Sequence, residues 1–107
     1  MKLLTKKILK KLPPLYATQD QNLANTKVIV KFFNPIGGQS WYASEFDPQE
    51  GIFFGFVNLG DDSLAELGYF SLKELKNLNL PLGFEVERDK FWNAETTLED
   101  VMSFKKR

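Results

Sequence analysis

Glu45 and Glu66 are the two residues of this sequence whose type and spacing come closest to acid–base chemistry. The chain has no His and no Cys, which removes the commonest general base, the commonest zinc ligand and every thiolate nucleophile. A pair of carboxylates remains as a possible acid and base, which is the arrangement that glycosidases use. In the sheet described below, the Cα atoms of Glu45 and Glu66 would lie about 12 Å apart, which is wide for such a pair. We therefore expect two solvated charges, no catalytic residue and no enzymatic activity.

Other polar motifs offer little for a metal or a phosphate. Asp61 and Asp62 are adjacent in the segment NLGDDS, without the alternating ligands and the distal Glu of a calcium loop. Gly37 and Gly38 follow a predicted strand but do not open a helix, so they lack the amide groups that would cradle phosphate. Both segments are typical of turns, and we expect neither a metal nor a cofactor.

Composition and charge limit the class of protein. The 107 residues are 43% hydrophobic and include ten Phe, enough for one domain with its own core. The first 16 residues hold five Lys and no acid, whereas residues 17–104 hold all 14 acidic residues and only six basic ones. Such asymmetry is typical of nucleic-acid or membrane contact through basic ends, or of an acidic body that avoids nucleic acid. The remaining alternative is that the basic ends lie against their own acidic body.

The basic start lacks the features of a targeting signal. The segment MKLLTKKILKKLPPLY has no continuous apolar region and no small-residue cleavage site, and no apolar run near 18 residues occurs in the chain. We expect a cytoplasmic protein without membrane contact, either a monomer or a homodimer.

Periodicity and turn residues predict the elements that position these side chains. Within residues 1–16, apolar residues at helical spacing after the N-cap Thr5 predict a short basic helix that ends at Pro13. Four runs of strand composition follow, separated by turn residues, and predict an antiparallel meander. Their ranges are 27–33, 40–46, 52–57 and 64–70.

The remaining elements complete a single domain over residues 1–107. Ser71 and Glu74 have capping-box spacing before a second short helix, and residues 82–89 alternate as a fifth strand at an edge, so the sheet core spans residues 27–92. A capping box at Thr96 opens a helix over residues 96–104, before a basic tail at 105–107. The predicted fold is α+β, an antiparallel four- or five-stranded meander sheet with short helices packed on one face.

The strand register predicts two unlike faces, because opposed residues in such a sheet point to the same side. We paired Phe33 with Trp41, Phe46 with Ile52 and Val57 with Leu64. One face, which includes Tyr69, is then apolar except for Ser44 and is the predicted core. The other face is mixed and is the predicted binding surface, with the candidate residues Lys31, Phe33, Trp41, Glu45, Phe53 and Glu66.

Two further features belong to that predicted surface. Gly55 and Gly68 fall on it, and their lack of side chains would let a partner group or the Trp41 ring lie close to the backbone. Arg88, in the segment ERD, is the last candidate. It either pairs with Glu45 or Glu66, or it is an exposed edge charge that discourages strand addition.

Six segments resemble, in order and spacing, a bacterial family of small proteins known only as a domain of unknown function. They are MKLLTKKILKKLPPLYAT, VKFF, WYASEFD, FFGFV, ELGYFSLKEL and PLGFEVERD, and together they span about residues 1–92. The resemblance implies no activity and no catalytic residue. It does imply a setting, because members occur on plasmids, conjugative elements and phages, whose accessory genes often act on host defence, plasmid transfer or DNA upkeep.

Four functional hypotheses follow. The first is a small non-enzymatic accessory protein of mobile-element origin that binds another macromolecule through the mixed face. We expect that macromolecule to be a protein. It would be contradicted if the chain's own C-terminal segment covered that face. The second is an anti-defence factor whose acidic body imitates DNA. The third is nucleic-acid binding through the first helix, with Lys6, Lys7, Lys10 and Lys11. The fourth, a hydrolase, needs Glu45 and Glu66 within about 10 Å in a cleft.

Overall fold

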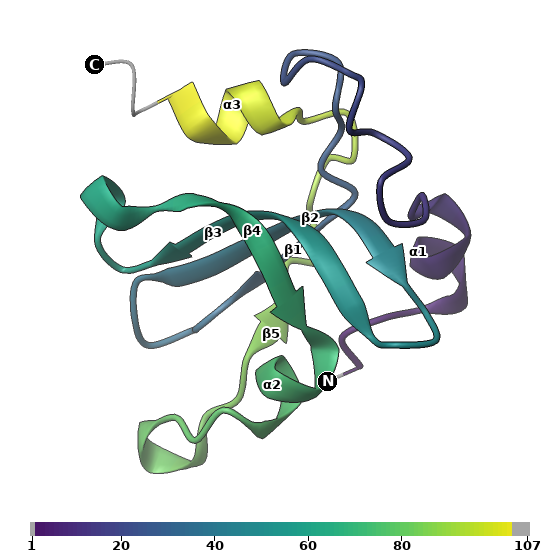
Figure 1. Ribbon diagram of the computed structural model, residues 1–107. Helices are drawn as coiled ribbons and strands as arrows, with labels where there is room; N and C mark the ends of the chain where they lie inside the picture. Colours follow the sequence, from purple (N-terminus) through teal and green to yellow (C-terminus); the bar gives the residue numbers. More distant parts are fainter. Residues whose placement is uncertain (1, 104–107) are drawn as a thin grey trace.

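A five-stranded antiparallel sheet forms the centre of the computed structural model, which describes residues 2–103 (Figure 1). The strands are β1 (Val30–Phe33), β2 (Gln39–Asp47), β3 (Ile52–Leu59), β4 (Glu66–Ser71) and β5 (Glu87–Arg88). Their spatial order is β4-β3-β2-β1-β5, so the first four strands form the predicted meander and β5 is added beside β1. The predicted α+β fold class is confirmed.

Three short helices flank the sheet, and local capping explains where they begin. They are α1 (Lys6–Lys11), α2 (Leu72–Asn77) and α3 (Leu98–Met102). The Thr5 side chain accepts a hydrogen bond from the Ile8 amide, and Ser71 accepts one from the Glu74 amide, as the sequence predicts. The predicted end of the last helix at residue 104 and the basic tail at 105–107 lie outside the described residues.

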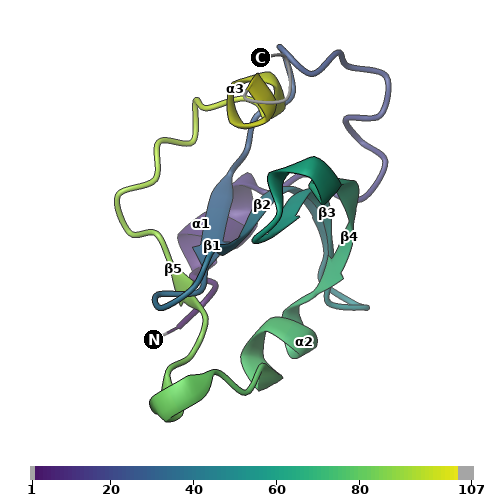
Figure 2. The ribbon, with the colours of Figure 1, turned by 90° about the vertical axis from the view of Figure 1, so that its left-hand side faces the viewer.

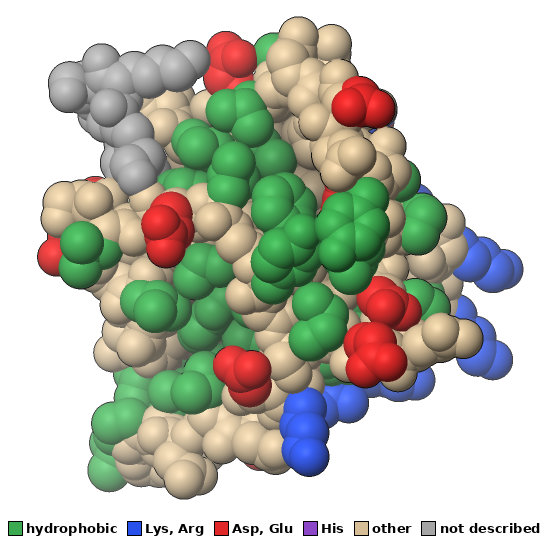
Figure 3. Space-filling view, viewed as in Figure 1, with side chains coloured by type: hydrophobic (Ala, Val, Ile, Leu, Met, Phe, Trp, Pro, Cys, Tyr) green, Lys and Arg blue, Asp and Glu red, His purple; other side chains and the backbone are tan. Residues whose placement is uncertain are grey.

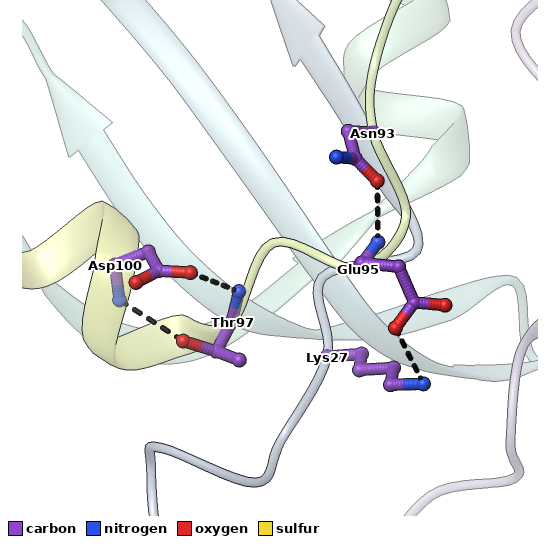
Figure 4. A network of polar contacts seen from close by, with 5 residues as sticks. All are labelled: Lys27, Asn93, Glu95, Thr97 and Asp100. Carbon is purple, nitrogen blue, oxygen red and sulfur yellow. Dashed lines mark hydrogen bonds and ion pairs between the residues drawn. The ribbon is translucent and has the colours of Figure 1, made fainter.

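The segment after β5 is attached to the chain just before β1. Trp92 donates its indole N–H to the Val28 carbonyl at 2.8 Å, and Lys27 forms an ion pair with Glu95, also at 2.8 Å (Figure 4). The N-cap of α3 is Thr97, one residue later than predicted, and its capping box with Asp100 is complete. These contacts hold α3 over one face of the sheet (Figure 1).

The fifth strand is shorter than predicted, with only Glu87–Arg88 paired to β1. A 3₁₀ turn, Pro81–Gly83, replaces the first part of the predicted strand, and Leu82 within it has a positive φ of 60°. Proline at the start of such a turn removes a donor and fixes φ, which stops strand pairing there.

The strand register differs from the predicted one at two places that matter for the faces. Phe32, not Phe33, lies opposite Trp41, and a β-bulge between Ala43 and Glu45 places Phe46 opposite Phe53. The pairing of β3 with β4 is shifted by two residues, which leaves the faces unchanged. A shift of one residue or one bulge moves side chains to the opposite side of a sheet.

Both faces of the sheet are consequently buried against other elements (Figure 2). On one side, here called the α1/α2 face, Phe32, Trp41 and Phe53 pack with residues of α1 and α2. On the other, the α3 face, Val28 and Phe56 pack with Leu98 of α3 and with neighbouring residues. The expectation that the helices share one face is wrong, because each face carries its own apolar row and each row needs a cover.

Candidate functional site

The predicted mixed face is not a surface of the folded protein. Trp41 is 5% exposed and Phe53 is fully buried, both within the core on the α1/α2 face. Glu66 lies on the same face, opposite Val57, but at the exposed edge. Helices α1 and α2, and not the C-terminal segment, cover this face. The hypothesis of binding through the mixed face is contradicted all the same. Trp41 and Phe53 are not available to a partner.

The other predicted residues lie elsewhere. The bulge turns Glu45 to the α3 face, where it is buried and 2% exposed. Lys31 and Phe33 are also on the α3 face, towards β5, where the Lys31 Nζ lies 5.5 Å from the ring centre of Tyr42. Arg88 is in β5, at the opposite edge of the sheet from Glu66, and it lies opposite Phe32 on the α1/α2 face, away from Glu45. Of its two predicted roles, pairing with Glu45 or Glu66 is therefore wrong, and Arg88 donates a hydrogen bond to the Lys2 carbonyl.

Glu45 and Glu66 do not form a catalytic pair, because they project from opposite faces of the sheet. Glu45 lies beside Phe54 on the α3 face, and Glu66 lies beside Val57 on the α1/α2 face.

The acidic turn NLGDDS holds its own carboxylate by hydrogen bonds. Asp61 accepts hydrogen bonds from the hydroxyl and the amide of Ser63, and these bonds lower the pKa of the Asp61 carboxyl. Residues 2–103 hold no cluster of three or more groups that could bind a metal ion.

Gly55 has a structural use at the bulge. A Cβ there would stand 1.7 Å from the carbonyl oxygen of Tyr42, so only glycine allows the two backbones to approach. The predicted role of Gly55, room for a partner group, is therefore wrong. Gly68 lies directly opposite it on β4, and its Cβ position has no atom within 4 Å.

Glu45 fixes a long loop to the sheet. Its Oε1 accepts a hydrogen bond from the Tyr16 amide at 2.8 Å, and its Oε2 accepts from the Thr18 amide at 2.9 Å and from the Thr18 hydroxyl. Tyr16 has a positive φ of 71°, a conformation that costs energy for a residue other than glycine. The hydrogen bonds to Glu45 offset that cost and hold the Tyr16 ring at the surface, where the residue is 60% exposed.

A pocket of about 200 Å³ opens over Glu45. Three aromatic residues, Tyr16, Phe54 and Tyr69, stand around it, and the ring centres of Phe54 and Tyr69 are 5.2 Å apart. Desolvation raises the pKa of the Tyr69 phenol, and the nearby Tyr16 hydroxyl and Glu45 carboxylate add to the rise. We call this hollow the Glu45 pocket.

A second hollow, of about 290 Å³, lies along β4 and shares two walls with the Glu45 pocket, Leu67 and Tyr69. Leu59 and Leu64 also line it and are 64% and 75% exposed. Figure 3 shows this face of the molecule, where hydrophobic side chains gather in the middle and acidic side chains lie among them. Lys and Arg side chains stand along the right and lower margins of this face. We call the two hollows with β4 between them the β4-edge surface.

β4 is an edge strand. No described strand pairs with its outer side, since it ends the order β4-β3-β2-β1-β5. Unpaired backbone donors and acceptors on an edge are a template for adding another strand, and charged or proline residues usually protect them. Among its six residues, ELGYFS, only Glu66 is charged and none is proline.

The opposite edge of the sheet carries a basic groove. Lys7 and Lys11 of α1 line it together with Arg88 and Lys90, and its volume is about 400 Å³. Asp89 is the one acidic residue among its described lining residues. All four Lys of α1, which include Lys6 and Lys10, are exposed.

The residues missed by the sequence reasoning are Tyr16 and Tyr69. The predicted register puts Tyr69 on the buried face, and Tyr16 falls between the predicted end of the first helix at Pro13 and the loop that follows. In a comparison with known protein families, residues 3–106 match the family described as "Protein of unknown function (DUF2958)". No curated protein and no solved structure matches the chain. In residues 2–103, no helix is both long and apolar enough to span a membrane.

Proposed function

The chain belongs to this family of unknown function, DUF2958, and we propose that it works by binding another protein at the β4-edge surface. The observation that carries the proposal is the position of β4, a strand with an unpaired outer edge that lies between two hollows. An extended segment of a partner can add to such an edge through backbone hydrogen bonds while its side chains enter the hollows. In the setting that the sequence resemblance implies, the protein is a non-enzymatic accessory of a mobile element.

The exposed side chains of this surface support the proposal. Tyr16, Leu64 and Tyr69 are all more than half exposed, and they surround hollows that share walls. Scattered single apolar residues are ordinary, whereas contiguous apolar residues beside an open strand edge mark an interaction surface. The acidic residues among them add a preference for a basic partner.

Site-specific photo-cross-linking tests the proposal. A benzophenone amino acid placed at position 64 should capture a discrete partner in the cell that carries the gene. The matched control is position 82, because Leu82 is also exposed, at 93%, but lies in the turn before β5. Capture at 64 and not at 82 is expected. Equal capture at both positions, or none at 64, overturns the proposal.

Nucleic-acid binding is the second candidate, and the basic groove favours it. Four cationic side chains converge there against a single acid, Asp89. Cationic grooves bind phosphates with an affinity that falls steeply as salt rises. Fluorescence anisotropy with a short DNA duplex should show such binding for the unmodified chain and a clear loss for the double substitution Lys7→Glu and Lys11→Glu. No binding even at low salt removes this candidate.

The charge distribution gives less support to DNA mimicry. An imitation of DNA needs acids in an extended row that follows the spacing of phosphates. On the face in Figure 3, acidic side chains are scattered among hydrophobic ones instead. The protein-binding proposal uses the same acids as a complement to a basic partner, without a fixed spacing.

A further inference from the structure

The bottom of the Glu45 pocket carries a carboxylate that no basic side chain of the described part of the chain neutralises. Both carboxylate oxygens accept hydrogen bonds, which is the pattern of the ionised form. All of these donors are neutral amide or hydroxyl groups. Among residues 2–103, no Lys or Arg side chain forms an ion pair with Glu45. A cation that entered the pocket would therefore meet an uncompensated, largely desolvated carboxylate.

The mouth of the pocket is suited to a cation as well. The faces of aromatic rings attract ammonium and guanidinium groups, and Tyr16, Phe54 and Tyr69 all line this pocket. The protein already uses such a cage near β5, where Lys31 lies within 5.9 Å of the ring centres of Phe33, Tyr42 and Trp92. The chain fills that cage with its own lysine, whereas no Lys or Arg among residues 2–103 forms an ion pair with Glu45.

The size of the pocket limits what can enter. Its volume of about 200 Å³ lies below the range of about 300–1,000 Å³ typical of small-molecule sites. A side chain fits better than a whole ligand. The walls shared with the second hollow, Leu67 and Tyr69, connect the pocket to the outer edge of β4.

We propose that the Glu45 pocket binds a Lys or Arg side chain of a partner segment that lies extended along β4. The inference rests on the proposed function and names the chemistry of the partner. The segment pairs with the β4 backbone, places its basic side chain in the Glu45 pocket and places an apolar side chain in the second hollow. Asp61 and Glu66, which line the second hollow, complement a basic segment.

Selection of random peptides displayed on phage against the full-length chain tests this inference without a known partner. Selected peptides should share one Lys or Arg at a fixed position. Replacing that residue with citrulline or norleucine should weaken binding between about threefold and thirtyfold. Tyr69→Leu in the protein should cause a similar loss, and so should Glu45→Gln. Phe91→Leu is the matched control, because Phe91 is 96% exposed beyond β5, and it should change nothing.

The outcomes separate the two proposals. Peptides that need Leu64 but share no basic residue overturn the cation pocket and leave the β4-edge proposal standing. Basic peptides that bind equally well to the Tyr69→Leu and Phe91→Leu variants also overturn the cation pocket. Tyr69 donates none of the hydrogen bonds that Glu45 accepts from the loop, so the Tyr69→Leu variant remains informative if Glu45→Gln fails to fold. Failure to select any peptide overturns both proposals.

Discussion

Glu45 accepts a 2.8 Å hydrogen bond from the backbone amide of Tyr16, a residue 29 positions earlier in the chain. This contact joins the β-bulge in β2 to the loop that follows α1, and it forms the bottom and one wall of the Glu45 pocket. The carboxylate that most resembled a catalytic group in the sequence is thus a structural anchor and, in our proposal, the base of a binding pocket.

Glu45→Gln should loosen this loop. The amide side chain presents an NH₂ group to one of the two backbone amides, which leaves a buried donor unsatisfied at a cost of about 1–3 kcal/mol in the free energy of unfolding. The amides of Tyr16 and Thr18 should exchange hydrogen faster. Glu50→Gln, in the exposed turn between β2 and β3, is the control and should shift stability by less than about 0.5 kcal/mol. Unchanged exchange at Tyr16 would contradict the anchoring role.

Gly55→Ala should be among the most damaging small substitutions in the chain. Its Cβ would stand 1.7 Å from the Tyr42 carbonyl oxygen, so the strands must separate at the bulge. We expect a loss of about 3 kcal/mol or more, measured by urea denaturation. Gly68→Ala is a matched control on the neighbouring strand, with open space at the Cβ, and should cost little. Similar losses for both variants would show that the close approach at Gly55 is not the cause.

Two buried hydroxyl groups should respond oppositely to removal. Within residues 2–103, the Ser44 hydroxyl is fully buried and has no hydrogen-bond partner, so Ser44→Ala should keep or raise the melting temperature. The Thr26 hydroxyl donates to the Asn22 carbonyl at 2.9 Å, so Thr26→Val should cost about 1 kcal/mol. Destabilisation by Ser44→Ala as large as that by Thr26→Val would reveal a partner for the Ser44 hydroxyl.

Tyr69 should ionise above its ordinary pKa of 10.0. Desolvation, then Tyr16 and Glu45, disfavour the phenolate, so the fold favours the neutral phenol. The resulting stabilisation is present below pH 10.0 and is lost as the pH rises through the raised pKa of the folded state. Tyr16→Phe should lower the pKa of Tyr69 towards 10.0, whereas Tyr42→Phe should leave it unchanged. Ultraviolet titration against the Tyr69→Phe variant measures it. A pKa at or below 10.0 in the unmodified chain would contradict the described pocket.

Local signals in the sequence predicted the elements well. Thr5 and Ser71 cap their helices as expected, because a cap depends on residues only three positions away. The N-cap of the third helix lies one residue later than predicted. Both Thr96 and Thr97 can cap a helix, and each has an acidic residue three positions later, Glu99 or Asp100. Asp100 decides the position by its hydrogen bond to the Thr97 amide.

The site could not be predicted in the same way, because it depends on contacts between distant segments. The bulge beside Ser44 leaves no mark in an alternating strand, yet it moves Glu45 from one face to the other. Tyr16 joins the pocket only through that moved carboxylate. Trp41, assigned to an outer face by alternation, is buried because α1 and α2 cover a second apolar row. Glu45 was among the candidate residues predicted from the sequence, but the face to which its side chain points was not predicted.

Amide hydrogen exchange of the full chain, alone and with the partner captured at position 64, tests the central claim most directly. The account predicts slower exchange in β4, Glu66–Ser71, and in the loop around Tyr16, with no change in β5 or α1. Slower exchange confined to α1 and β5, with β4 unchanged, would contradict it and would assign the binding site to the basic groove.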